Sequence, residues 1–357
     1  MKTLDRYILK ELLVPFLIGT FSVVLMFQAN MLIFQLKTFS LSAVPPEALV
    51  KLIVQKTPYF LNMTLPVGIS LATSLAISRL ARETELTAIR SAGGRIMRVC
   101  LPIMGFGIVV AVGNFFLVEK VMPKTEAEAR QIQTQLAILG AAPEFKSNVV
   151  INLRNYTANI GSVSSAKDNT LQLSRILLFE RPRVGEVVII SSEQGTYRDG
   201  IWNIPAATIW HVTGNTLTKL ETKKDVLINE PTTVENFFAT PTPEEQTAEQ
   251  LLKAIAEGKR AGWDTTRLQV AYHVRFAIPA SCILFALVAP VFAVYFARTG
   301  AFFGVLLSII LVFLYYNAHI ISTEIIGRNG WVAPWLAAWL PNIIFLVFGI
   351  VGIRRLE

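Results

Sequence analysis

The chain has 357 residues, of which 53% are hydrophobic and only 16% are charged. Soluble domains carry roughly 25% charged residues, so this composition argues against a purely soluble protein. The net charge of +8 arises outside residues 119–270: this stretch holds 17 Lys and Arg against 18 Asp and Glu, and the rest of the chain holds 16 against 7. Basic residues that flank apolar segments are typical of membrane proteins, and this distribution argues against a nucleic-acid partner.

Six apolar stretches are long enough to span about 30 Å of hydrocarbon as helices. They lie at about 13–34, 59–78, 100–118, 273–296, 301–323 and 334–353. The first is longer than the core of a signal peptide, and we expect it to stay as a membrane anchor. Cys100 and Cys282 fall inside two of these stretches and are expected to be small core residues rather than a disulfide.

The basic residues of the short loops predict the orientation. One side of the six predicted helices carries Lys2, Arg6, Lys10, Arg79, Arg82, Arg90, Arg95, Arg98, Arg298, Arg354 and Arg355. The other side carries only Lys37, Lys51, Lys56 and Arg328. Because cytoplasmic loops are enriched in Lys and Arg, we expect both termini in the cytoplasm and residues 119–270 outside it.

Residues 119–270 have the pattern of a water-facing β-domain with helical connectors at about 119–137 and 241–262. Short strands are expected at 149–153, 171–179, 187–191, 201–204, 208–212 and 216–220. Asp199-Gly200 suits the tight turn of a hairpin, and Gly214-Asn215 is a second turn candidate. The spacing predicts a sandwich or open barrel. This domain has no recognisable catalytic motif, so we expect a binding or conduit role and no cofactor.

The loop between the second and third helices is too polar to span a membrane but favours a short helix. Leu86 and Ile89 fall on one side of this helix, Glu85 lies among several arginines, and Gly93 can end it. One interpretation is a solvated loop whose arginines only set the topology. The other is a helix that docks into a groove of a cytoplasmic partner, with Glu85 paired to a basic residue there.

At this loop the chain resembles the lipopolysaccharide-export permeases of the LptF/LptG family. Leu80 to Gly93 is similar to the coupling helix of that family, and Leu4-Asp5-Arg6-Tyr7-Ile8 resembles its amino-terminal signature, which favours the G-type subunit. Further similar positions are Gln35-Leu36-Lys37, Pro66, Arg275-Phe276-Ala277-Ile278-Pro279, Ala289-Pro290 and Arg298-Thr299-Gly300. The resemblance covers nearly the whole chain.

The resemblance implies an α+β membrane protein: six transmembrane helices with a periplasmic β-jellyroll-like domain inserted between helices three and four. Residues 1–118 would hold helices one to three with a coupling helix at about 80–94, residues 119–270 the periplasmic domain, and residues 271–357 helices four to six. The chain would be an inner-membrane transport subunit. It would pair with a sister permease or a second copy of itself, with a cytoplasmic ABC ATPase dimer and with a periplasmic bridge protein.

The cargo implied by the resemblance is lipopolysaccharide or a related glycolipid, drawn from the outer leaflet of the inner membrane. The chain lacks the G-x-x-x-x-G-K-[ST] phosphate-binding pattern, so we expect a non-catalytic subunit whose partner hydrolyses ATP. The expected ATPase-coupling residues are Glu83, Glu85, Leu86, Ile89 and Arg90. The lipid-binding candidates are Lys37, Gln35 and Arg275.

Each lipid-binding candidate has an alternative. Lys37 can contact a lipid phosphate, but it can also be a lysine at a helix end that extends toward the interface. Arg275 is equally compatible with a structural contact between helices. An envelope-sensing receptor that signals through residues 79–98 is an alternative function, although six helices exceed what a sensor needs. A lipid-modifying enzyme is disfavoured because the membrane stretches lack a cluster of catalytic polar groups.

Overall fold

The computed structural model describes eleven ranges of the chain. They are residues 3–38, 45–136, 145–152, 156–165, 170–183, 186–198, 201–213, 216–229, 242–260, 264–296 and 301–356. Contacts divide the chain into two compact units, one of residues 1–31, 53–128 and 242–357, the other of residues 32–52 and 129–241. The first unit is a helical bundle, and the second contains an antiparallel sheet.

Within the described ranges, six helices are long and apolar enough to cross a membrane, as the sequence predicts. The helices are α1 (Thr3–Thr38), α2 (Pro46–Arg82), α3 (Glu85–Ser91), α4 (Met97–Phe116), α5 (Met122–Leu136), α6 (Ala248–Arg260), α7 (Thr266–Tyr295), α8 (Ala301–Ile320) and α9 (Pro334–Leu356). Two π-helical turns, η1 (Leu117–Val121) and η6 (Ile321–Gly327), and a 3₁₀ turn, η4 (Pro243–Glu245), complete them. The third spanning helix is the continuous run Met97–Gln133, in which η1 joins α4 to the polar α5.

Local chemistry explains several helix ends. Pro46 and Pro334 occupy the first positions of α2 and α9, where the missing N–H leaves no helical hydrogen bond unmade. Before α6, the Thr247 hydroxyl accepts the Gln250 N–H at 3.3 Å, and the Gln250 side chain accepts the Thr247 N–H at 2.8 Å, which forms a capping box. Gly93 has a φ of 79° and ends the turn after α3, as predicted.

The helix α7 is the centre of the bundle. In its most apolar stretch 78% of the residues are buried, against 22% for α1 and 28% for the fifth spanning helix. Gly107 allows α4 to approach closely, because a Cβ there would lie 2.4 Å from the Cβ of Ala286 on α7. Cys282 is also on α7 and, like Cys100, is a buried core residue, as predicted.

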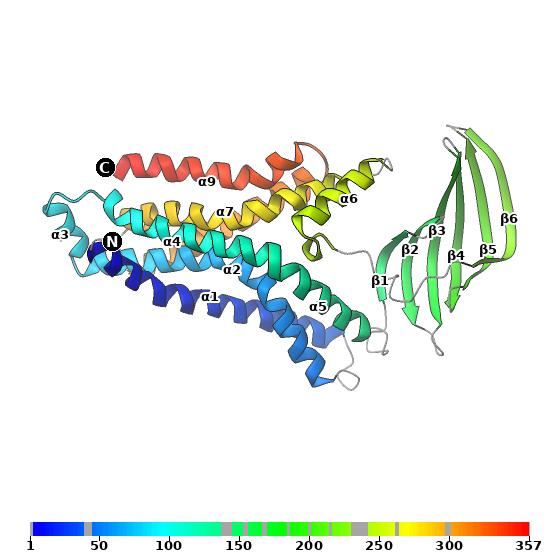
Figure 1. Cartoon of the computed structure of the whole chain (residues 1–357), viewed down its shortest axis with the longest axis horizontal. Coiled ribbons are helices and arrows are strands. Elements are labelled where there is room, and N and C mark those ends of the chain that lie inside the picture. Colours follow the sequence, from blue (N-terminus) through cyan, green and yellow to red (C-terminus); the bar gives the residue numbers. More distant parts are fainter. Residues whose placement is uncertain are drawn as a thin grey trace. The chain divides into compact units, whose positions relative to one another are not determined.

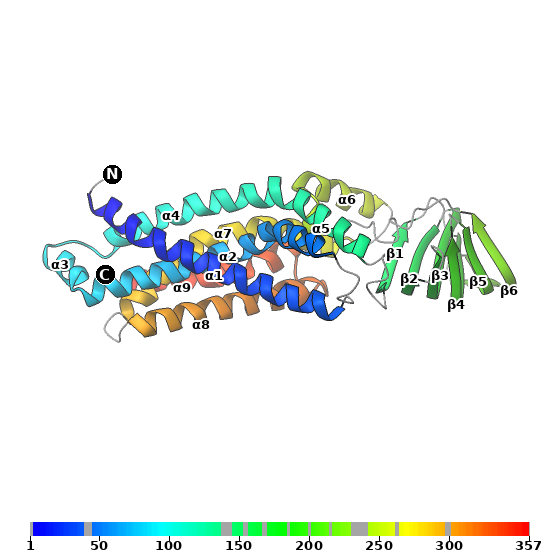
Figure 2. The same cartoon turned by 90° about the horizontal axis from the view of Figure 1, so that it is seen from below.

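The helices of the bundle run between two ends that carry different elements (Figures 1 and 2). The first turns of α1, the last turns of α9 and the short helix α3 lie together at one end in both views. The helix α6 lies at the opposite end. Both ends of the chain therefore lie at the same end of the bundle as the predicted coupling helix.

The sheet lies between the third and fourth spanning helices in the chain, as predicted, and its strands follow one another in an antiparallel meander (Figure 1). They are β1 (Phe145–Asn152), β2 (Tyr156–Ser165), β3 (Leu171–Arg183), β4 (Glu186–Arg198), β5 (Ile201–Thr213) and β6 (Thr216–Asn229). The described strands pair only with their neighbours in sequence, so they make a simpler order than a two-sheet jelly roll. Arg198 pairs with Ile201, which confirms the predicted hairpin, although its turn residues 199–200 lie outside the described ranges.

The sequence prediction missed β2 and divided β5 into two strands. β2 contains Ala, Asn, Gly and Ser, which have weak strand preference, and β5 contains Pro205, which cannot donate a ladder hydrogen bond. In β3 the buried residues change from odd to even numbers: Leu173 precedes and Ile176 follows the left-handed Arg175, whose φ is 52°. This change of phase keeps both halves of the strand in one apolar core.

Candidate functional site

The short helix α3 is the first candidate site. It covers Glu85–Ser91, so it is shorter than the predicted helix at about 80–94, because Leu80 to Arg82 continue α2. Thr84 separates the two helices with a left-handed φ of 59°. Glu83, in this turn, and Arg90, in the last turn of α3, are exposed.

The apolar side of α3 packs against its own bundle. Leu86 is 7% exposed and belongs to the bundle core, and Ile89 packs against the same core. Neither side chain is therefore available as a projecting anchor. The part of α3 that a partner can contact is the opposite, polar side, which includes Arg90.

Polar side chains of α1 surround this end of the bundle and connect it to three other elements. The links join Asp5 to Arg98, Tyr7 to Glu85, and Glu11 to Arg79. The Tyr7 hydroxyl lies 3.0 and 2.9 Å from the two carboxylate oxygens of Glu85, and Asp5 lies 2.6 Å from the Arg98 guanidinium. The first turns of α1 thus hold α2, α3 and α4 together, and we call this end the docking end.

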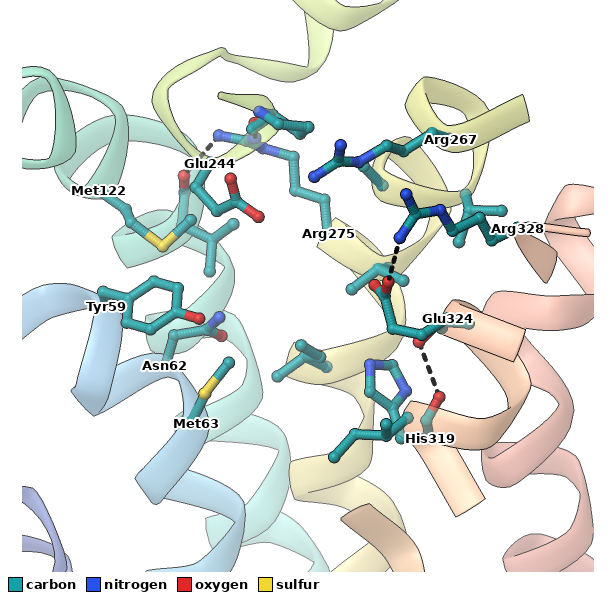
Figure 3. A pocket seen from close by; sticks show the side chains of 18 residues that line it. Tyr59, Asn62, Met63, Met122, Glu244, Arg267, Arg275, His319, Glu324 and Arg328 are labelled. Atoms are coloured by element: carbon teal, nitrogen blue, oxygen red, sulfur yellow. Dashed lines mark hydrogen bonds and ion pairs between the residues drawn. The ribbon is translucent and has the colours of Figure 1, made fainter. Parts of the chain in front are cut away.

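A pocket of about 260 Å³ at the α6 end is the second candidate site (Figure 3). Its wall is formed by parts of α2 and α7, the end of α8 with η6, the junction of η1 with α5, and η4. The lining residues are Tyr59, Asn62, Met63, Val118, Met122, Pro243, Glu244, Arg267, Val270, Ala271, Val274, Arg275, Ile278, His319, Ile320, Thr323, Glu324 and Arg328. The pocket therefore combines an apolar wall with charged groups of both signs.

Arg275 lies in the wall of this pocket with a nearly buried side chain, 3% exposed. Its Nε lies 2.9 Å from a Glu119 carboxylate oxygen, and its Nη2 donates to the Val118 carbonyl at 2.8 Å. Its Nη1 donates to the Pro243 carbonyl at 3.4 Å. The guanidinium is thus satisfied by protein groups, which supports the structural alternative for this residue.

Glu119 extends the same contact to α6. Its carboxylate oxygens each lie 3.2 Å from the backbone N–H of Ala248, the first residue of α6, where a negative charge is favourable. The π-helical turn η1 carries Glu119, and such turns are frequent at functional positions. We call the contacts of Arg275 with Glu119, Val118 and Pro243, together with Ala248, the Arg275 junction. It joins the third and fourth spanning helices to η4 and α6, the helical elements that follow the sheet in the chain.

The family model of the lipopolysaccharide export system permease LptF/LptG matches residues 6–355. The chain belongs to the LptF/LptG family. The match covers all six spanning helices and the sheet between the third and the fourth, so the chain is a multi-pass membrane protein of this permease family. A search of curated proteins returned no match.

The LptF/LptG lipid-binding candidates lie in different parts of the structure. Arg275 lines the pocket, whereas Gln35, in the other compact unit, is buried near the end of α1. Lys37 is in the last turn of α1, and its side chain lies outside the described residues. The five predicted coupling residues do lie together in and beside α3, but two of them face the core.

Sequence reasoning missed the partners of two predicted residues. Tyr7 stands inside the amino-terminal motif, and its hydroxyl on the same predicted side as the loop between the second and third helices was a usable signal. Glu119 directly follows the third apolar stretch, and a carboxylate at that position is a natural partner for Arg275 at the start of the fourth. Within the described ranges, no group of three or more His, Cys, Asp or Glu side chains could hold a metal ion.

Proposed function

We propose that the chain is a transmembrane subunit of an ABC-type complex that exports lipopolysaccharide. In this proposal the subunit extracts the lipid from the outer leaflet of the inner membrane and passes it to a periplasmic bridge protein. The observation that carries the proposal is the family match, which spans residues 6–355. Because this family consists of permeases, it favours transport over the alternative function of an envelope-sensing receptor.

The proposed orientation places both termini and α3 in the cytoplasm. Residues 1–118 and 271–357 then form the membrane part, and residues 119–270 form the periplasmic part. The basic loop residues support this orientation, because most of them lie at the docking end. The apolar residues that α1 and the fifth spanning helix leave exposed suit contact with lipid and with a sister subunit or a second copy.

An ATPase dimer is proposed to dock on the polar side of α3. Glu83, Glu85 and Arg90 would contact the ATPase, whereas Leu86 and Ile89 would pass its movement to the bundle core. Glu85 has oxygen lone pairs beyond those that Tyr7 uses, so it can also pair with a cation of the partner. A movement of α3 that ATP hydrolysis causes at the partner would thereby be passed to α1 through the hydrogen bond of the Tyr7 hydroxyl with Glu85.

The sharpest test is Glu85→Gln in the full chain, co-expressed with its ATPase and sister subunit. The amide oxygen still accepts the Tyr7 hydroxyl, so α3 keeps its place, but the charge for the partner is lost. We expect less ATPase to co-purify and less lipid to be released by ATP from reconstituted vesicles. Glu249→Gln, on the exposed surface of α6, is the matched control. Normal assembly and transport in Glu85→Gln would contradict docking through this charge.

A further inference from the structure

Two buried polar side chains that line the pocket, Asn62 and His319, each have an atom without a hydrogen-bond partner among the described residues (Figure 3). Asn62 is 5% exposed and His319 is 8% exposed. The side-chain oxygen of Asn62 and Nδ1 of His319 are buried and make no hydrogen bond within the part of the chain that the structure describes. Buried polar atoms of native proteins are nearly always paired, so these two indicate a ligand that forms hydrogen bonds.

Charges of both signs surround the opening of the pocket. Figure 3 shows Arg267 and Arg328 beside each other, with Glu324 next to Arg328 and Glu244 across the opening, near Arg275. Arg328 and Glu324 form only a long contact of 3.9 Å, and both are more than 60% exposed. Arg267 has no hydrogen bond or ion pair among the described residues. Because Arg275 is already neutralised in its junction, the opening carries two positive and two negative groups.

Polarity also changes with depth. The residues of α7 that line the pocket run from Arg267 to Ile278, a distance of roughly 16 Å along the helix axis at 1.5 Å per residue. The charged groups lie toward the helix ends, and Met63 and Ile278 line the pocket further along α2 and α7. The volume of about 260 Å³ is below the roughly 300–1,000 Å³ of typical ligand pockets. It suits a headgroup and the adjoining part of its chains, but not a whole lipid.

We propose that this pocket binds the headgroup of a zwitterionic phospholipid, which carries a phosphate and an ammonium group on an apolar body. Arg267 and Arg328 bind the phosphate, and Glu244 and Glu324 bind the ammonium group. Asn62 and His319 hydrogen-bond polar groups of the lipid below the charged opening. A purely anionic head would leave the carboxylates of Glu244 and Glu324 facing negative charge. The pocket should therefore bind a zwitterionic lipid more tightly than an anionic one. The proposal requires only a membrane location and does not depend on ATPase docking.

The test is native mass spectrometry of the purified full chain in detergent, with lipids that share their acyl chains and differ in their heads. We expect phosphatidylethanolamine to be retained several times more than phosphatidylglycerol. Free glycerophosphoethanolamine should bind much more weakly, because it lacks the apolar body. Equal binding of this soluble head would show a site for a soluble phosphate compound and would overturn the lipid proposal.

Variants connect the preference to the pocket. Arg267→Gln should remove most of the preference for phosphatidylethanolamine, and Asn62→Leu or His319→Gln should lower its retention. Arg260→Gln, an exposed arginine at the end of α6 that does not line the pocket, is the matched control. The proposal fails if Arg267→Gln behaves like Arg260→Gln, or if the two lipids bind equally to the unmodified chain. ATPase co-purification of the Arg267→Gln variant should stay normal, which separates this site from the docking end.

Discussion

The two ends of the bundle are held together in different ways. At the docking end, side chains of α1 reach three elements through contacts that are partly open to water, such as Asp5–Arg98, where the side chains are 18% and 30% exposed. At the α6 end, one guanidinium that is only 3% exposed gathers a carboxylate and two backbone carbonyls. Water therefore competes with both partners of a contact at the first end, whereas at the second it reaches Glu119, which is 20% exposed, but hardly the Arg275 guanidinium.

This difference indicates which end can move. Partly exposed ion pairs contribute little stability, because solvent screens them and long side chains lose freedom when they are fixed. Breaking a buried pair is much more costly, because one charge is left without a partner in a place that water does not reach. We therefore expect α3 to shift during a transport cycle, while the Arg275 junction keeps its geometry.

The largest effect is expected for Glu119→Leu. This change leaves the buried Arg275 guanidinium without its carboxylate, and it should destabilise the bundle by about 3–5 kcal/mol. The thermal unfolding midpoint of the purified chain in detergent should fall accordingly. The double variant Glu119→Leu/Arg275→Leu should recover part of this loss, since both charges are then absent. Glu249→Leu, on the exposed surface of α6, is the control, and an equal midpoint for it and Glu119→Leu would contradict a rigid junction.

An intermediate effect is expected for Leu86→Ala. The change removes the main apolar contact of α3 with the core, at a cost of about 2–5 kcal/mol for a buried leucine. The loss should appear as faster hydrogen exchange in residues 85–91 and as ATP hydrolysis that no longer releases lipid. Thr87→Ala, one residue further along and exposed, should leave both measurements near normal. If the amides of residues 85–91 exchange no faster in Leu86→Ala than in Thr87→Ala, the apolar side of α3 does not hold the helix in place.

The smallest effect is expected for Tyr7→Phe. It removes only the hydroxyl that bonds Glu85, in a contact that is partly exposed, and leaves the ring in place. Hydrogen exchange of α3 should rise less than in Leu86→Ala, and the unfolding midpoint should hardly change. A fall in the midpoint as large as that of Glu119→Leu would mean that both ends are equally rigid, which would remove the contrast between them.

The membrane part was largely predictable because spanning length and apolar composition are properties of a continuous segment. All six helices were predicted on that basis, and the sheet between the third and fourth was predicted from short strand patterns and turn residues. The bounds of α3 were predicted too widely, since nothing in Leu80 to Arg82 distinguishes the end of α2 from a new helix. In the sheet, β2 was missed because its small polar residues have no strong strand preference, and only its pairing with β1 and β3 supports it.

The candidate sites depend on contacts between residues that are distant in the chain. Glu119 and Arg275 are 156 positions apart, and Tyr7 and Glu85 are 78 apart, so no local pattern connects them. The membrane segments and the β-domain can be read from the residues alone, because the hydrophobic effect acts on each segment separately. The packed fold was needed to show that Leu86 faces the core, that Arg275 is neutralised, and that Asn62 and His319 share a pocket. Each of these depends on which helices pack side by side, and packing selects partners by shape and by the need to pair buried polar groups.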